Sequence, residues 1–154
     1  MQNQMSKTQR ELVASVLEGF EMLREDAVRT RDGNHTSFLN AEKTRKLGVT
    51  SPGLTDFYHY AHYVQADAEV REWDGVLQSV RKANPDNLAE LEAALVAAMV
   101  NVGGKVAALV SDTTQYDSFA MAGFVKQRQG SARVAKEVNA TLWTVRSMRE
   151  RYAA

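Results

Sequence analysis

Apolar side chains recur along the chain at the three- and four-residue spacing that places them on one face of a helix. The clearest stripe consists of Leu12, Val13, Val16, Leu17, Phe20 and Leu23. Stripes of this kind predict helices over residues 6–30, 38–47, 54–83, 87–102 and 118–129. No stretch alternates between apolar and polar residues for long enough to build a sheet. The pattern therefore predicts an all-α, compact multi-helix domain with roughly six to eight helices.

Turn-forming residues divide these segments. The clearest stop is Asn84-Pro85-Asp86, because proline disfavours helical geometry in the residue before it. Further breaks are predicted at residues 32–34 (DGN), Gly48, 50–53 (TSPG), Gly103-Gly104, 111–117 and Gly130. The pattern leaves open whether 54–83 is one helix or two.

The composition narrows the class of protein. A chain of 154 residues suits one domain, or a small domain with an appendage, and 44% apolar with 25% charged residues is ordinary for a globular protein. The absence of cysteine excludes disulfides, thiolate zinc sites and cysteine nucleophiles. No apolar run reaches the roughly 20 residues that span a bilayer, and the N-terminus does not resemble a signal peptide. We therefore expect a cytoplasmic protein.

The net charge of zero conceals an uneven distribution. Residues 122–154 contain seven Lys and Arg against two Asp and Glu, so residues 1–121 carry the opposite charge of −5. The sequence thus divides into an acidic helical body over 1–117 and a basic segment over 118–154. A basic end favours a polyanionic partner. The alternative is that the acidic body and the basic segment pack on each other.

The basic segment contains a pattern of small and apolar positions over residues 131–152. Counted from Ser131, an apolar and a small residue occupy the fourth and fifth positions, and Asn139 occupies the ninth, where left-handed backbone is needed. Thr141 is suited to cap a following helix. The pattern is completed by Val134, Ala135, Val138, Val145 and Met148. These positions predict two short helices joined by a turn at 139–141.

This segment of about 22 residues resembles the helix-turn-helix superfamily of DNA-binding proteins. The resemblance implies that 142–152 is a recognition helix on which Arg146 contacts guanine. It also implies that Arg133, Lys136, Arg149 and Arg151 hold phosphates. The remaining candidate DNA-binding residues are Thr141, Trp143, Thr144 and Ser147. Leu142 and Trp143 depart from the pattern, since polar residues are usual there, and they could face DNA, a partner or the core.

Two other motifs compete for a role. Residues 44–61 match the same pattern more weakly, and there Lys43, Arg45 and Lys46 would serve phosphates. His59 and His62 share a helical face at a spacing that chelates zinc weakly, but a firm site needs a third ligand. We instead expect an aromatic packing helix or a dimer seam there, with no metal and no cofactor. The sequence has no phosphate loop, dinucleotide fingerprint or HExxH motif, so no enzymatic activity is predicted.

These observations predict a DNA-binding transcriptional regulator of phage or plasmid type that acts by occupying an operator. Double-stranded DNA would be its partner, and the apolar stripes near 12–23 and 88–102 would form a homodimer that reads two half-sites. The alternative is an α-helical protein–protein interaction module without nucleic-acid binding, in which Leu142 and Trp143 dock a partner. A ring-forming DNA-packaging adaptor is a third possibility.

Overall fold

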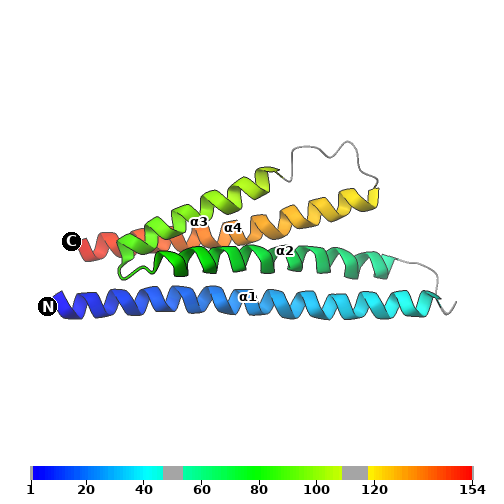
Figure 1. Ribbon diagram of the computed structural model, residues 1–154, viewed down its shortest axis with the longest axis horizontal. Coiled ribbons are helices and arrows are strands. Elements are labelled where there is room, and N and C mark those ends of the chain that lie inside the picture. The colour runs from blue at the N-terminus through cyan, green and yellow to red at the C-terminus, as the bar shows by residue number, and fades with distance from the viewer. Residues whose placement is uncertain (1, 47–53, 109–117, 154) are drawn as a thin grey trace.

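The described part of the chain forms four long helices that run alternately up and down, so that the start of the first helix and the end of the last helix lie on the same side of the molecule (Figure 1). The computed structural model describes residues 2–46, 54–108 and 118–153. The helices are α1 (Gln2–Lys46), α2 (Leu54–Ala83), α3 (Leu88–Ala108) and α4 (Ser118–Ala153). The all-α prediction is confirmed. The expected six to eight helices are wrong for the described residues, because several predicted breaks lie inside continuous helices.

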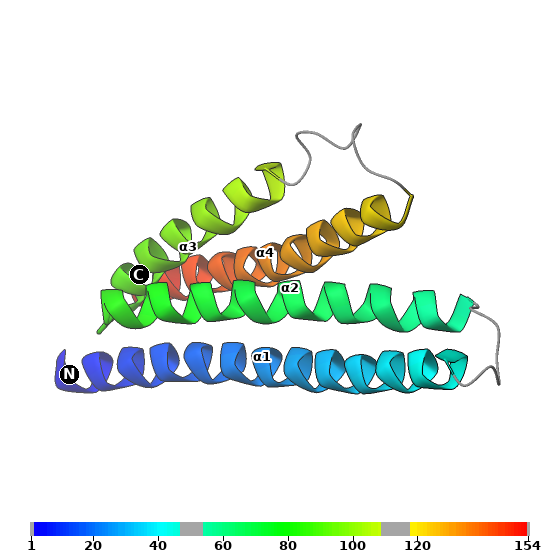
Figure 2. The same cartoon turned by 45° about the vertical axis from the view of Figure 1, so that its right-hand side comes forward.

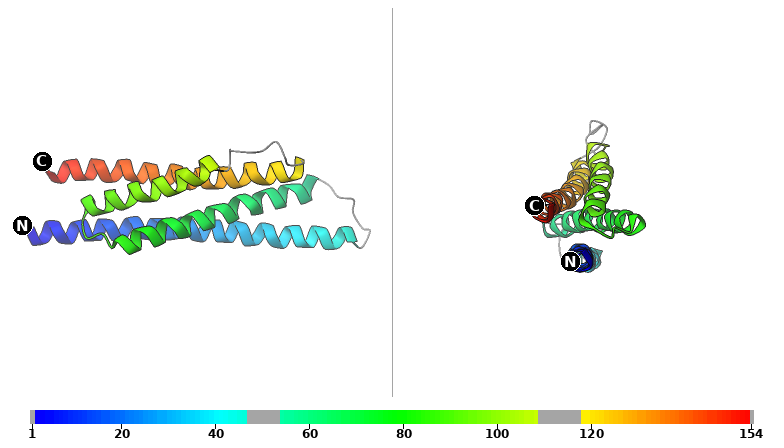
Figure 3. Two further views of the ribbon diagram at one scale, coloured as in Figure 1. Left: turned by 45° about the horizontal axis from the view of Figure 1, so that its top comes forward. Right: turned by 90° about the vertical axis from the view of Figure 1, so that its left-hand side faces the viewer.

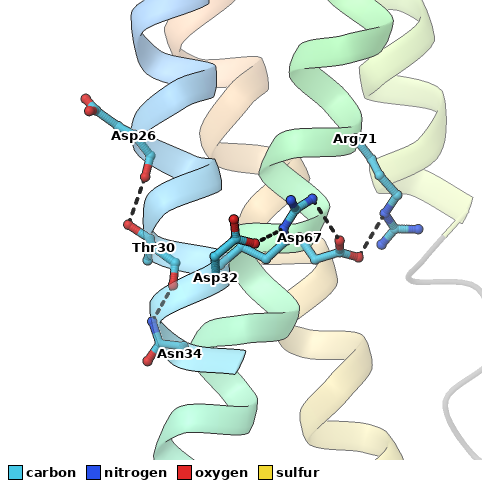
Figure 4. A network of polar contacts seen from close by, with 7 residues as sticks. Asp26, Thr30, Asp32, Asn34, Asp67 and Arg71 are labelled. Carbon is cyan, nitrogen blue, oxygen red and sulfur yellow. Dashed lines mark hydrogen bonds and ion pairs between the residues drawn. The ribbon is translucent and has the colours of Figure 1, made fainter. Parts of the chain in front are cut away.

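The first of these absent breaks is the turn expected at residues 32–34. Within α1 the Thr30 hydroxyl donates to the Asp26 carbonyl at 3.0 Å, and the Asn34 amide donates to the Thr30 carbonyl at 2.8 Å (Figure 4). The polar side chains thus bond to carbonyls of the preceding turn and remain compatible with helix. Segment 54–83 likewise forms one helix, α2. The loops expected at 50–53 and 111–117 lie outside the described residues.

The stop at Asn84-Pro85-Asp86 is confirmed. Asn84 has a left-handed φ of 47°, and its N–H donates to the Val80 carbonyl at 3.1 Å, which closes the C-terminus of α2. Asn87 then begins the next helix, since its side-chain oxygen accepts from the Glu90 N–H at 2.9 Å. Local sequence determines this connection, because asparagine tolerates left-handed backbone and proline cannot continue α2.

All four helices contribute to a single hydrophobic core near the end where the chain termini lie. The Phe20 and Trp73 rings pack with their centroids 5.1 Å apart. The core consists of Val13, Phe20, Ala27, Val70, Trp73, Val76, Leu77, Val80, Leu88, Leu91, Ala94, Leu95, Ala98, Val102, Val134, Val138, Leu142 and Val145. The core includes the buried side chains of the stripes near 12–23 and 88–102, which were predicted to form the homodimer contact. A homodimer would therefore need another surface. Within the described residues, no helix is long and apolar enough to cross a membrane.

The other end of the bundle is packed differently. Going from its start, α3 rises away from α2, and Figures 2 and 3 show the divergence from other directions. There α2 and α4 meet through small residues: a Cβ on the buried Gly130 would lie 2.4 Å from the Gln65 carbonyl oxygen.

An ion pair joins α1 to α2, since Arg31 of α1 lies 3.8 Å from the Asp67 carboxylate of α2. Asp67 also pairs with Arg71 on its own helix (Figure 4). Close backbone approach, ion pairs and aromatic contacts such as Phe38 with Tyr60, whose ring centroids are 5.6 Å apart, hold this end together.

The predicted helix-turn-helix geometry is wrong, because α4 continues without interruption through residues 139–141. The Thr141 hydroxyl donates to the Glu137 carbonyl at 3.0 Å, as in a helix interior, and does not cap a new helix. The cause is a continuous stripe of buried residues, Val134, Val138, Leu142 and Val145. A turn at 139–141 would redirect the second half of this stripe away from the core. Asn139 costs a helix only about 0.5 kcal/mol relative to alanine, which is less than that loss.

Candidate interaction surface on α3 and α4

Two arginines of the predicted recognition helix bind an acidic residue of the body. The Arg146 Nε atom donates to the Glu92 Oε1 atom at 2.8 Å, and Arg149 donates to the other carboxylate oxygen. These hydrogen bonds, Arg146 first and Arg149 second, hold the pKa of Glu92 below its ordinary value of 4.5, although burial opposes them in part. Glu92 therefore remains ionised and ties α3 to α4.

A third arginine from the basic segment is also matched by the acidic body. Arg133 lies 3.4 Å from the carboxylate of Glu69 on α2. Glu69 is itself buried and accepts from Gln65 on the same helix. Part of the positive charge of the basic segment is thus paired with carboxylates of the acidic body. This agrees with the alternative that the body and the basic segment pack on each other.

The two apolar residues that departed from the helix-turn-helix pattern have opposite environments. Leu142 is 5% exposed and belongs to the core, whereas Trp143 is 61% exposed on the outside of α4. The Arg146 guanidinium lies over the Trp143 ring, 5.4 Å from its centroid. The chain Glu92–Arg146–Trp143 therefore connects α3 to the exposed tryptophan.

The other predicted DNA-binding residues are distributed around α4. Lys136, Thr144, Ser147 and Arg151 are exposed, and the Thr144 hydroxyl donates to the Ala140 carbonyl at 3.1 Å. The structure brings together Trp143, Arg146 and Arg149 beside Glu92. It places Arg133 on a different side of α4, toward α2. The nine residues do not form the compact reading surface that a turn at 139–141 would have given them.

The sequence prediction missed the outward face of α3. Val96 is 39% exposed and Val100 is 69% exposed, and the neighbouring alanines of the same face are exposed as well. We define the α3 outer face as Ala89, Ala93, Val96, Ala97 and Val100. The segment 93–103 contains no charged residue. That absence of charge was visible in the sequence, because a helix that is apolar all round is normally covered on every side.

The α3 outer face and Trp143 lie on either side of the Glu92 cluster. Glu92 is one helical turn before Val96 on α3, and Trp143 is one turn before Arg146 on α4. Two arginines surround the single carboxylate of Glu92, so this border keeps one positive charge in excess. The arrangement is an apolar helix face with an exposed aromatic ring at its edge, which is a composition found at protein interfaces.

The histidine motif of α2 is part of an aromatic cluster. The His59 Nδ1 atom lies 3.2 Å from the Asn34 side-chain oxygen, and the His62 ring packs 4.2 Å from the Tyr58 ring. His35 packs on Tyr63 in the same way. Among the described residues, no three histidine, aspartate or glutamate side chains are grouped so that they could hold a metal ion.

The second match to the helix-turn-helix pattern cannot be placed in full, because its turn, 47–53, lies outside the described residues. Lys43 is exposed near the end of α1. Comparison with known proteins adds no further assignment: no protein-family model, curated protein or solved structure matches this chain.

Proposed function

We propose that this chain is an α-helical protein–protein interaction module that docks a partner on the α3 outer face, with Trp143 at the edge of the contact. The observation that carries this proposal is the exposure of Val100, at 69%, together with Val96, at 39%, on a helix face that contains no charged residue. Contiguous apolar surface on a helix is typical of interaction sites, because water is a poor environment for it.

The energetics support docking there. Covering exposed valine side chains contributes roughly 1 kcal/mol each, and an exposed tryptophan adds a larger area at low conformational cost. Arg146, which was expected to contact guanine, and Arg149, which was expected to hold a phosphate, are in contact with Glu92. Arg133, a second expected phosphate contact, is paired with Glu69. Releasing them for DNA would leave partly buried carboxylates without their hydrogen bonds, which is unfavourable. This favours the interaction module over the DNA-reading segment.

The test is the double variant Val96→Glu/Val100→Glu, with Met22→Glu on exposed α1 surface as the matched control. We expect the urea-unfolding free energy of the double variant to stay within about 1 kcal/mol of wild type, because both side chains lie outside the core. Fluorescence of a dye that binds apolar surface should fall for the double variant and not for the control. A loss of several kcal/mol would show that the α3 outer face serves the fold, and the proposal would fail.

A second candidate function is binding to double-stranded DNA along the outward side of α4. It is favoured by the exposure of Arg128, Lys136 and Arg151 on that helix. In this hypothesis the chain is a transcriptional regulator of phage or plasmid type that occupies its operator without a helix-turn-helix. Phosphate contacts by these residues would make binding strongly salt-dependent.

Fluorescence anisotropy with a mixed-sequence duplex separates the two functions. DNA binding through three phosphate contacts should weaken on the order of 40-fold between 50 and 200 mM salt. The variant Lys136→Ala/Arg151→Ala should bind less tightly and respond less to salt. If wild type fails to bind at low salt, the DNA hypothesis is excluded and the interaction module remains.

A further inference from the structure

We infer that the occupant of the α3 outer face is α3 of a second copy of this chain, packed antiparallel across a two-fold axis. This inference rests on the proposed function and adds to it the identity of the partner. It is carried by three properties of the face: the spacing of its side chains, their sizes, and the distribution of charge around them.

The spacing is that of a helix-pairing seam. Ala89, Ala93, Val96 and Val100 are all exposed and follow one another at intervals of four, three and four residues. This is the a and d spacing by which paired helices interdigitate. The opposite face of α3, which includes Leu88, Leu91 and Leu95, is already occupied by the core of the same chain. The seam is therefore a second packing face on one helix.

The side-chain sizes make the seam complementary to itself. In an antiparallel pair, a positions of one helix share layers with d positions of the other. One register places Ala89 opposite Val100 of the second copy and Ala93 opposite Val96 of the second copy. Each valine then faces an alanine, so the two helices can approach to about 8 Å, the close end of the usual range. A parallel pair would place alanines on alanines and leave gaps.

The charge distribution fits the same register. Glu90 lies opposite the uncharged stretch 97–101 of the second copy, so no carboxylate meets another across the seam. Glu92 balances one of the two positive charges of Arg146 and Arg149, so the border keeps a single excess positive charge and does not require a strongly acidic partner. A neutral face bordered by internal ion pairs is best matched by an equally neutral face, and the second copy supplies one.

The size of the seam determines the expected affinity of the dimer. Residues 89–100 span about 17 Å of helix, and a standard interface buries about 800 Å² on each partner. The α3 outer face alone is smaller than that. We therefore expect a reversible dimer with a dissociation constant on the order of 10–100 μM, in the range of weak association.

Sedimentation equilibrium from 5 to 500 μM tests the dimer directly. We expect wild type to pass from monomer to dimer over this range, and Val100→Glu to weaken dimerisation at least tenfold. Met22→Glu is the control and should dimerise as wild type does. Because the chain has no cysteine, a mixture of the Ala93→Cys and Val96→Cys variants provides an independent probe, since these two positions face each other across the seam. The mixture should form a disulfide-linked dimer under mild oxidation, whereas Met22→Cys should not.

The outcomes distinguish the second copy from the interaction module in general. A monomeric wild type together with Ala93→Cys and Val96→Cys variants that do not cross-link to each other would overturn the inference. A dimer that Val100→Glu leaves intact would overturn it as well, because the dimer would then use another face. In either case the proposed function survives if Val96→Glu/Val100→Glu remains folded and loses dye binding. It fails separately if that variant unfolds.

Discussion

The Arg146 Nε atom of α4 lies 2.8 Å from the Glu92 Oε1 atom of α3, and Arg149 binds the other oxygen of the same carboxylate. This contact changes the interpretation of the basic C-terminal segment. The sequence predicted that these two arginines contact DNA, but in the structure they join α3 to α4 within one bundle. The exposed feature beside them is apolar, and it is the α3 outer face with Trp143.

The Glu92 contact predicts a specific pH dependence of stability. Its pKa is lower in the folded protein than its ordinary value of 4.5, so the contact contributes stability above pH 4.5. This contribution is lost as the pH falls through the lowered pKa, because protonation removes the charge that the arginines bind. Glu92→Gln should cost roughly 0.5–1 kcal/mol at pH 7, a modest value because the arginines are partly exposed.

Urea unfolding at pH 7, 5, 4 and 3 measures this effect. The difference between wild type and Glu92→Gln should shrink toward zero at the acid end. Glu11→Gln, at an exposed carboxylate of α1, is the control and should show a smaller difference than Glu92→Gln at pH 7 and little change with pH. A Glu92→Gln difference that stays constant down to pH 3 would contradict the electrostatic origin of the effect.

The unbroken course of α4 predicts opposite signs for two asparagine variants. Asn139→Ala should stabilise the protein by about 0.5 kcal/mol, because alanine is the better helix former at an exposed helical position. Asn84→Ala should destabilise by about 1 kcal/mol, because Asn84 has a left-handed φ of 47° that alanine adopts poorly. Thermal unfolding of both variants checks this. If Asn139→Ala instead loses stability, that result would support the turn at 139–141 that the helix-turn-helix pattern predicted.

Neighbouring residues on α4 should differ sharply in their effect on stability. Leu142→Ala removes a core side chain that is 5% exposed, and it should cost about 2–4 kcal/mol. Trp143→Ala removes an exposed ring whose main intramolecular contact is Arg146, and it should cost less than about 1 kcal/mol. Guanidinium unfolding measures both values. Equal costs would mean that Trp143 is covered within the monomer.

The close contact between α2 and α4 predicts that even the addition of a single methyl group at Gly130 lowers the stability of the protein. A Cβ at position 130 would lie 2.4 Å from the Gln65 carbonyl oxygen and 2.9 Å from the Ala68 Cβ atom. Gly130→Ala should therefore destabilise by about 1–3 kcal/mol, despite the better helix propensity of alanine. Gly33→Ala is the matched control, because nothing lies within 4 Å of its Cβ, and it should stabilise by up to about 1 kcal/mol. Differential scanning calorimetry of the pair compares the two effects, and a stabilised Gly130→Ala would argue against the close approach.

The sequence established the class of fold, the inner faces of the helices and the connection at Asn84-Pro85-Asp86. These follow from local physics, since helical spacing identifies the buried stripe and a left-handed asparagine followed by proline ends a helix. The stripe over 134–145 was also visible in the sequence. Its assignment to two short helices was wrong because spacing across Asn139 fits both a turn and a straight helix.

The tertiary structure alone decided which of two compatible geometries each ambiguous segment adopts. Residues 32–34 and 139–141 stay helical because the bundle buries the stripes on both sides of them, and that gain exceeds the small local cost of glycine or asparagine. The ion-pair partners of the arginines could not be predicted from local sequence patterns either. Glu92 and Arg146 are 54 residues apart and meet only when α3 packs on α4. The same packing covers one face of α3 and leaves the α3 outer face exposed.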